Sequence, residues 1–417
     1  MAGLSITAAH PDPALLDLPW RLPLEEWPEE ILAALPRGIS RHVVRFVRLS
    51  GRVVAIKEIK DDIARREYEL LRNLGRLDLP SVAPYAVISG RETRSGEPLD
   101  ACLITHHLQF SLPYRALYSQ NLRRGTAIRL IDALAVLLVR LHLAGFWWGD
   151  VSLSNTLFRR DAGAFSAYLV DAETGELRER LSPGQRDHDL DIARVNIAGE
   201  LMDLEAGGLL QEDRDPVVVS ERILIRYHEL WDALTGGELI EEGERWRVDE
   251  RIRALNELGF DVGELAMSTD IDGTRIHIQP KVVDAGHHSR RLLRLTGLDV
   301  RENQARRLLN DLDAYTAAVG RQGDDEELVA HDWLARIYEP VTRRVPKELT
   351  QKLEPAEIFH EVLEHRWYLA ERARHDIPIF DALEDYLSTV LPSRPDEATV
   401  VGVDTTHMPV LAPPSAG

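Results

Sequence analysis

A polar loop between an apolar helix and two short apolar strands limits most strongly what this chain can fold into. The loop follows Trp148, carries Asp150 and Asn155 five residues apart, and leads into a strand that begins at Thr156. A second apolar strand ends on Asp171. Because antiparallel neighbouring strands bring their ends side by side, we expect Asp150, Asn155 and Asp171 to converge on one spot.

These three side chains match the needs of phosphoryl transfer. One carboxylate faces the attacking hydroxyl, while an amide and a second carboxylate hold Mg²⁺ on the phosphates. Asp150 would take the first role, and Asn155 and Asp171 the second. A surface loop rich in Asp, Ser and Asn that only joins two core strands has the same local sequence, so the assignment depends on partners elsewhere in the chain.

The catalytic loop of the protein-kinase-like fold resembles the segment GDVSLSN at residues 149–155. The pattern GD-x-S-x-x-N is shared by its lipopolysaccharide-kinase and small-molecule branches, including aminoglycoside phosphotransferases and RIO-type kinases. The whole chain also resembles an uncharacterised actinobacterial family of lipopolysaccharide-kinase-like proteins with an appended domain of unknown function. This resemblance implies ATP and Mg²⁺ as cofactors and a hydroxyl group as acceptor.

A second part of the kinase pattern lies earlier in the chain. Two β-rich runs at 42–49 and 52–59 flank Ser50-Gly51, which predicts a hairpin. The second run contains VAIK, which resembles the kinase strand whose lysine contacts the α and β phosphates. Lys57 is that lysine here.

A helix expected at 63–77 supplies a partner for this lysine. Glu67 is the first candidate to pair with Lys57, because small-molecule kinases place a helix glutamate just before a Leu-rich stretch in the same way. Glu69 is the alternative. A glutamate on a helix face is otherwise simply a solvated charge.

The glycine-rich phosphate loop of kinases is absent from its expected place before Lys57. Backbone N–H groups around Gly38, Ser40 and Arg41 would still form an anion-binding nest for the nucleotide. The side chain of His42 is a further candidate to hold it. This departure from the family pattern favours an alternative function, that of a pseudokinase.

A segment that resembles the hinge between kinase lobes follows two further expected strands, at 82–89 and 101–105. Thr105 and His106 are the candidates to hold adenine through backbone groups. The neighbouring histidines 106 and 107 invite a metal site, but adjacent side chains of an extended chain point to opposite faces.

Two departures concern the residues around the catalytic loop. Trp148 stands where many kinases have a bracing histidine, and Asp171-Ala172-Glu173 replaces Asp-Phe-Gly, which favours a constitutively formed site. In kinase-like folds an aspartate at the start of the next helix, here expected at 184–204, accepts N–H bonds from the loop. Asp189 or Asp191 would do so in this chain.

The fold class predicted is α+β, a two-lobed protein-kinase-like fold with an appended, mostly helical C-terminal domain. A helical stripe closes the kinase-like part, and Thr235-Gly236-Gly237 marks the boundary. A hairpin is expected at 265–283 with its turn at Asp272-Gly273. The expected division is an N-terminal arm (1–36), a β-rich nucleotide-binding lobe (37–108), a helical catalytic lobe (109–235), a C-terminal helical α+β domain (236–394) and a disordered tail (395–417). The arm has a helical pattern at 25–35, and further helices are expected at 122–144, 246–258, 301–319, 326–344, 355–374 and 379–390.

A basic island is unusual in a chain with a net charge of −19. On one exposed face it would bind an anionic partner, either a phosphorylated acceptor or nucleic acid. The alternative is internal pairing with the acidic runs at 241–244 and 324–327. The island consists of Arg290, Arg291, Arg294, Arg306 and Arg307.

Composition excludes several classes of protein. The hydrophobic content of 44% and charged content of 29% are ordinary for a globular domain. The negative charge argues against general affinity for nucleic acid or anionic membranes. The single cysteine permits no intramolecular disulfide, and no apolar stretch approaches the ~20 residues of a membrane span. With no signal peptide evident either, we expect a cytoplasmic protein without a membrane span.

The function predicted from the sequence is ATP- and Mg²⁺-dependent phosphotransfer to a hydroxyl of an acceptor that the sequence does not identify. Asp150 orients or deprotonates the acceptor, Asn155 and Asp171 hold Mg²⁺, and Lys57, positioned by Glu67, grips the phosphates. Two alternatives stay open. One is a nucleotide-binding pseudokinase scaffold acting through its C-terminal domain, and the other is transfer of AMP by the same site.

Overall fold

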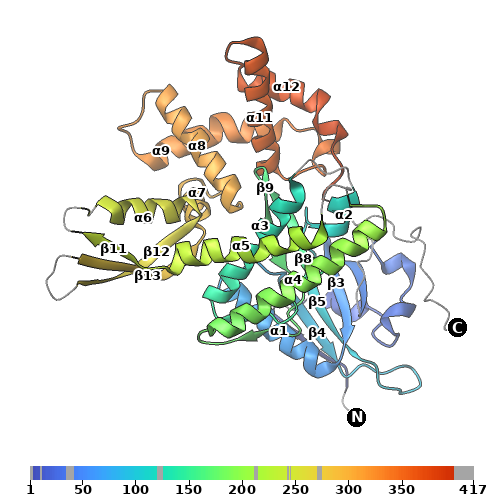
Figure 1. Cartoon of the computed structure of the whole chain (residues 1–417). Helices are drawn as coiled ribbons and strands as arrows, with labels where there is room; N and C mark the ends of the chain where they lie inside the picture. Colours follow the sequence, from blue (N-terminus) through green and yellow to red (C-terminus); the bar gives the residue numbers. More distant parts are fainter. Residues whose placement is uncertain are drawn as a thin grey trace.

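The chain folds into a sheet-rich lobe, a helical lobe and a mostly helical C-terminal region, as the sequence predicts (Figure 1). In Figure 1 the sheet-rich lobe is blue, the helical lobe is teal to green, and the C-terminal region runs from yellow to red. The computed structural model describes residues 3–9, 12–33, 42–119, 125–210, 215–241, 244, 246–269 and 275–398.

The sheet-rich lobe is built on five antiparallel strands in the order β1-β4-β5-β3-β2. Its β2–β3 hairpin turns at Ser50 and Gly51, whose positive φ values of 47° and 79° suit a two-residue hairpin turn. Helix α1 covers one face, where Tyr68 and Leu71 share a buried cluster with Val87 of β4. The elements are β1 (Ser5–Ala8), β2 (Val43–Leu49), β3 (Arg52–Ile59), α1 (Asp61–Arg76), β4 (Pro84–Ser89) and β5 (Ala101–His106).

The N-terminal arm packs on the opposite face of this sheet. Trp20 and Trp27 are buried there together with apolar residues of β2 to β5. The helix predicted around 25–35 is wrong for the described residues, which form only short 3-10 turns at Leu24–Glu26 and Glu29–Ile31. A proline precedes each turn, and since proline has no N–H and a fixed φ, it starts a turn but interrupts a continuous helix.

Helix α3 forms the centre of the helical lobe. The helix predicted at 122–144 is described from Thr126 to Leu143, while residues 120–124 lie outside the described part. Its buried positions recur at three- and four-residue steps and pack with α4 and α5 in the largest core. The elements are β6 (Leu112–Pro113), α2 (Tyr114–Ser119), α3, β7 (Phe146–Trp147), β8 (Thr156–Asp161), β9 (Ala164–Leu169), β10 (Glu176–Leu177), α4 (Pro183–Ala206) and α5 (Pro216–Thr235).

The C-terminal region joins a three-stranded antiparallel sheet, in the order β11-β13-β12, to helices around a core of their own. The predicted hairpin is present as β12 and β13, and its expected turn at Asp272-Gly273 lies outside the described residues. A π-helical turn at Leu334–Tyr338 interrupts the helix predicted at 326–344, just before Pro340, which lacks an N–H. The elements are β11 (Glu238–Glu241), α6 (Trp246–Glu257), β12 (Phe260–Thr269), β13 (Arg275–Ala285), α7 (His287–Thr296), α8 (Glu302–Ala318), α9 (Glu326–Trp333), α10 (Glu339–Arg343), α11 (Pro355–Ala373) and α12 (Ile379–Thr389).

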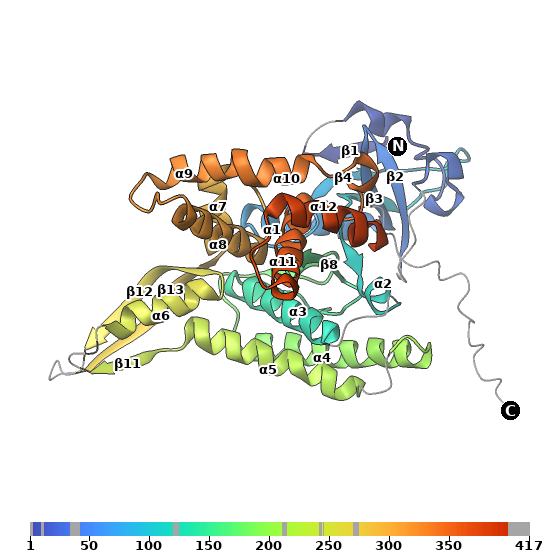
Figure 2. The same cartoon turned by 90° about the horizontal axis from the view of Figure 1, so that it is seen from above.

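Polar contacts attach the C-terminal region to the tip of the β8–β9 hairpin (Figure 2). The carboxylate of Asp161, at the end of β8, accepts the N–H of Gln304 at 2.8 Å and the amide of Asn303 at 3.0 Å. Glu357 of α11 accepts the N–H of Ala162 at 3.0 Å. The hairpin that begins after Asn155 and ends before Asp171 is therefore held at its far end by the C-terminal region.

The start of the predicted disordered tail is ordered. Glu397 is buried and pairs with Arg160 at 2.7 Å, so the disorder predicted from Pro395 is wrong for residues 395–398. Residues 399–417 lie outside the described part of the chain. Among the helices of the described residues, none has the length and apolarity that crossing a membrane requires.

Candidate active site

The backbone between α3 and β8 is held in a defined shape before it presents functional groups. The chain reverses after α3 at Gly145, whose φ is +80° and where an added Cβ would lie 2.0 Å from the carbonyl oxygen of Arg178. Only glycine fits there. The buried indole of Trp148 donates from Nε1 to the backbone oxygen of Asp171 at 2.8 Å. This tryptophan thus braces the segment after β9.

Asp189 of α4 braces the first half of the loop. Its two carboxylate oxygens accept the backbone N–H groups of Trp148 at 2.8 Å and Gly149 at 2.7 Å. A ring nitrogen of the buried His142 lies 3.1 Å from the same carboxylate. The sequence left Asp189 and Asp191 open for this contact, and the structure assigns it to Asp189, whereas Asp191 is exposed.

The same face of α4 holds the second half of the loop. Asn196 and Glu200 follow the bracing aspartate by seven and eleven residues, which places all three on one side of the helix. Asn196 donates to the carbonyl oxygen of Val151 at 3.0 Å, and Glu200 accepts the N–H groups of Leu153 and Ser154, both at 2.8 Å. Burial raises the pKa of Glu200 despite these bonds. Neither residue is predicted from the sequence, although their spacing from the aspartate places them on its side of the helix.

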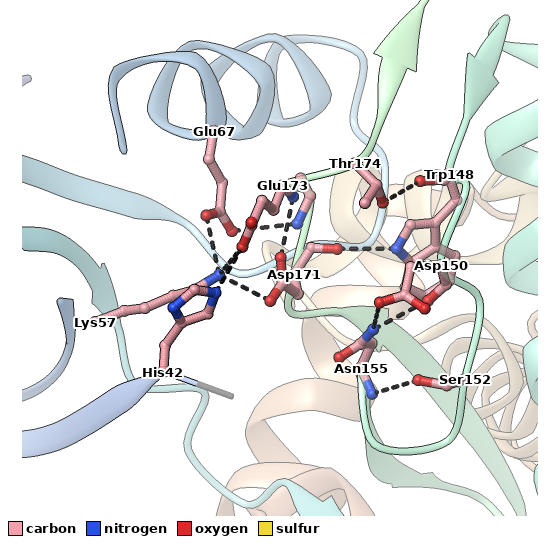
Figure 3. A network of polar contacts seen from close by, with 11 residues as sticks. His42, Lys57, Glu67, Trp148, Asp150, Ser152, Asn155, Asp171, Glu173 and Thr174 are labelled. Atoms are coloured by element: carbon pink, nitrogen blue, oxygen red, sulfur yellow. Dashed lines mark hydrogen bonds and ion pairs between the residues drawn. The ribbon is translucent and has the colours of Figure 1, made fainter. Parts of the chain in front are cut away.

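Asp150 and Asn155 meet within this loop. The amide nitrogen of Asn155 donates to the carboxylate and to the backbone oxygen of Asp150, both at 3.0 Å. The N–H of Val170 donates to the carbonyl oxygen of Asn155 at 3.1 Å, which joins the two ends of the hairpin. Figure 3 shows the result, with Asp171 lying between Lys57 and the Asp150–Asn155 pair.

Lys57 of β3 contacts three carboxylates. Its Nζ lies 2.8 Å from Asp171, 3.2 Å from Glu67 of α1 and 3.2 Å from Glu173. The pair predicted between Lys57 and Glu67 is therefore present, and the side chain of Glu67 is only 1% exposed. The alternative, Glu69, lies on the solvent side of α1 with 56% of its side chain exposed.

The protonation of this cluster reflects one cation shared by three carboxylates. Burial opposes the charge of Lys57, but the coulombic attraction of Glu67 and the other carboxylates outweighs it and raises the pKa of Lys57. Burial, followed by repulsion from Asp171, raises the pKa of Glu67 to about 7. Burial would also raise the pKa of Asp171, but Lys57 and the N–H of Glu173 bring it below its ordinary value.

The donor set around Lys57 fits a magnesium ion. Carboxylate oxygens of Glu67, Asp171 and Glu173 all lie within 4.8 Å of one another. Three carboxylates against one lysine leave a surplus of negative charge, and oxygen atoms are the ligands that Mg²⁺ prefers. Asn155, the other predicted ligand, presents its amide beside this cluster (Figure 3).

Of the two groups of residues predicted to bind the nucleotide, only one lies within the described part of the chain. Gly38, Ser40 and Arg41 lie outside the described residues. Thr105 and His106 are the last residues of β5, and the N–H of His106 donates to the carbonyl oxygen of Ala83 at 2.8 Å. This N–H is therefore engaged within the sheet-rich lobe, and contact of Thr105 and His106 with adenine stays a prediction.

Glu173 is a site residue whose contacts are not predicted from the sequence. Besides Lys57, it contacts the ring of His42, the residue directly before β2, at 3.0 Å. It stands two residues after Asp171, where the Asp-Phe-Gly pattern has a glycine. A glycine has no side chain and would leave the space beside Lys57 open. The carboxylate of Glu173 occupies that space and brings a negative charge to the lysine.

The basic island of the C-terminal region is partly engaged by carboxylates. Arg290 pairs with Asp261 at 2.5 Å, and Arg291 pairs with Glu326 of the acidic run 324–327. The internal-pairing alternative therefore describes these two arginines. Binding of an anionic partner stays a prediction for the others, which are Arg294, Arg306 and Arg307.

Two segments of the chain match known families. Residues 51–200 match the lipopolysaccharide kinase (Kdo/WaaP) family, and residues 229–391 match a domain of unknown function, DUF4032. Among solved structures, "WaaP in complex with acyl carrier protein" is similar at 17% identity and a TM-score of 0.35, covering 61% of this chain and 99% of that chain. No curated protein matches the chain.

Proposed function

We propose, from the premise that this chain joins a lipopolysaccharide-kinase-like fold to a DUF4032 domain, that it transfers phosphate from ATP to a hydroxyl group with the help of Mg²⁺. One observation carries the proposal. Lys57 contacts Glu67 and Asp171 together, while Asp150 and Asn155 lie paired on the adjoining loop. Phosphoryl transfer requires a cation on the phosphates, a metal site and a carboxylate facing the acceptor, all at one place.

The residues of the chain have distinct tasks in this proposal. Lys57 binds the phosphates of ATP, and Glu67 keeps the ammonium group in place. Asp150 orients the acceptor hydroxyl and accepts its proton, in a loop that α4 holds from one side. Asn155 and Asp171 would hold Mg²⁺, which neutralises charge on the phosphates when bound. Because the transition state is loose, most of the rate comes from positioning and charge stabilisation.

The remaining parts of the nucleotide site belong to the same proposal. Backbone N–H groups around Gly38, Ser40 and Arg41 would contact the phosphates, and backbone groups of Thr105 and His106 would contact adenine. We also propose that the units of the chain follow the division expected from the sequence, with the tail beginning later. A site that depends on ATP and a chain whose one cysteine is free and buried fit a cytoplasmic protein.

A pseudokinase scaffold is the second candidate, and one observation favours it. Glu173 lies 3.2 Å from Lys57 and 3.0 Å from His42, so that a carboxylate competes with phosphate for both groups. Against it, Asp150 and Asn155 would have no task in a protein that only binds nucleotide. Transfer of AMP by the same site is the third candidate.

Labelled ATP separates these functions. The purified chain is incubated with γ-labelled or α-labelled ATP in a lysate of the source cells, in parallel with Asp150→Asn and with Asp191→Asn as an exposed control. Transfer of the γ label alone, lost in Asp150→Asn and kept in Asp191→Asn, supports phosphotransfer. Transfer of the α label supports AMP transfer, and binding of ATP without transfer of either label supports the pseudokinase.

A further inference from the structure

The ammonium group of Lys57 already has an acceptor for each of its N–H groups. A lysine ammonium carries three N–H donors. Three carboxylates accept from this one, Asp171 at 2.8 Å and Glu67 and Glu173 at 3.2 Å each (Figure 3). The phosphate contact proposed for Lys57 therefore requires that one of these carboxylates moves away.

Two of the three carboxylates are also held by the backbone. The second oxygen of Glu67 accepts the N–H of Ala172 at 3.2 Å, and this side chain is almost fully buried. The second oxygen of Asp171 accepts the N–H of Glu173 at 3.0 Å. Moving either carboxylate would take an acceptor away from a backbone N–H, which destabilises the folded chain.

Glu173 is the carboxylate that leaves Lys57 at the lowest cost. In the described part of the chain, one of its oxygens contacts two side chains, those of Lys57 and His42. Its side chain is 27% exposed, so water can solvate the carboxylate when it moves. Residue 173 also lies in a turn between β9 and β10, outside the sheet and the helices.

The charge of the entering ligand decides whether this carboxylate moves. Three carboxylates face one ammonium group, and a triphosphate alone would add more negative charge to them. Glu173 also lies within 4.8 Å of the carboxylates of Glu67 and Asp171, close enough for all three to face one cation. At equal distance a divalent cation attracts a carboxylate more strongly than an ammonium group does. A nucleotide that enters with Mg²⁺ would therefore draw Glu173 away from Lys57.

We propose that Glu173 makes the active site selective for a nucleoside triphosphate that is complexed with a divalent cation. Its carboxylate occupies Lys57 against metal-free nucleotide, and it turns to the cation when the complex enters. One N–H of Lys57 is then available to the phosphates. This inference rests on the proposed role of Lys57 in phosphotransfer. A glycine at position 173, as in the Asp-Phe-Gly pattern, would leave the lysine open to both forms of the nucleotide.

Calorimetric titration of the full chain with the non-hydrolysable ATP analogue AMP-PNP, in EDTA and in Mg²⁺, tests the proposal. The wild-type chain should bind the Mg²⁺ complex about tenfold or more tightly than the metal-free analogue. Glu173→Gln removes the charge and should strengthen binding in EDTA by about tenfold, without strengthening it in Mg²⁺. Glu173→Gly should shift both affinities in the same directions, and it decides the result if Glu173→Gln does not fold.

Two further variants separate the effect on Lys57 from a general effect of charge. Glu176→Gln is the matched control, because it removes the same charge from an exposed side chain that pairs with Arg178, and its affinities should equal those of the wild type. Adding Glu173→Gln to Lys57→Ala should bring much less gain in EDTA than adding it to the wild type, since the gain comes from the freed lysine.

The outcomes distinguish a failure of this inference from a failure of the proposed function. Equal wild-type affinity for both forms of AMP-PNP, or an unchanged affinity in EDTA in both Glu173 variants, overturns the role of Glu173 and leaves phosphotransfer standing. A full gain in EDTA in the absence of Lys57 also overturns it, because Glu173 then acts by repulsion alone. If neither the wild-type chain nor any variant binds AMP-PNP in Mg²⁺, the proposed phosphotransfer fails, and this inference fails with it.

Discussion

Replacing Glu67 by glutamine should stabilise the folded chain above neutral pH while weakening its function. Glu67 is almost fully buried, and its pKa of about 7 means that the folded protein binds a proton there more tightly than the unfolded chain, where the value is near 4.5. A carboxyl whose pKa is raised by folding costs stability as pH rises between these two values. Glutamine has nearly the same shape, still accepts the N–H of Ala172, and carries no charge to bury.

The magnitude follows from the size of the pKa difference. One pKa unit corresponds to about 1.4 kcal/mol, so full ionisation of Glu67 costs about 3 kcal/mol of folding free energy. Between about pH 5 and about pH 8.5, the free energy of unfolding of Glu67→Gln should rise relative to wild type by about 2 to 3 kcal/mol. The same change removes one of the three carboxylates around Lys57, so the affinity for ATP should fall.

Urea unfolding of both proteins across this pH range measures the effect. Glu69→Gln is the matched control, because Glu69 lies on the same helix but is exposed, and its difference from wild type should be small and independent of pH. If Glu67→Gln is less stable than wild type by the same amount at every pH, Glu67 is ionised throughout. Burial would then not raise the pKa of Glu67, contrary to the prediction.

Three further changes test other parts of the site. Asp189→Asn should lower the free energy of unfolding by about 1 to 3 kcal/mol and reduce the transfer rate more than the affinity for ATP, because one buried N–H of the loop loses its acceptor; urea unfolding and steady-state kinetics measure both. Gly145→Ala should cost about 2 to 4 kcal/mol of stability, since its Cβ would clash with the oxygen of Arg178, and an unchanged melting temperature would contradict this. Asp171→Asn should make calorimetric ATP binding insensitive to Mg²⁺, and a wild-type dependence on Mg²⁺ would exclude Asp171 as a ligand.

The parts of the site that the sequence predicts well are those set by local structure. Asp150, Asn155 and Asp171 lie at the ends of one hairpin, so their convergence follows from strand pairing alone. The approach of Glu67 to Lys57 was expected from a family pattern, and its depth of burial was not, because burial depends on how α1 packs on the sheet. In the N-terminal arm, Pro23 and Pro28 are visible in the sequence and disfavour a continuous helix.

Contacts between segments that are distant in the sequence cannot be predicted from local sequence patterns. Glu200 holds the loop at Ser154 across more than forty residues, and a helix glutamate is far more often solvated than bonded in this way. The attachment of Asp161 to Gln304 joins two regions whose relative position no local pattern specifies.

Transfer of the γ-phosphate by wild-type chain and by Asp150→Asn, at equal occupancy by ATP, tests the central claim most directly. Calorimetry first establishes that both proteins bind Mg²⁺ and ATP with the same affinity, since the carboxylates that pair with Lys57 are those of Glu67, Asp171 and Glu173. The account predicts transfer to an acceptor by the wild-type chain and a loss of about a hundredfold or more in the variant, as for a removed catalytic base. Equal rates in the two proteins would contradict it.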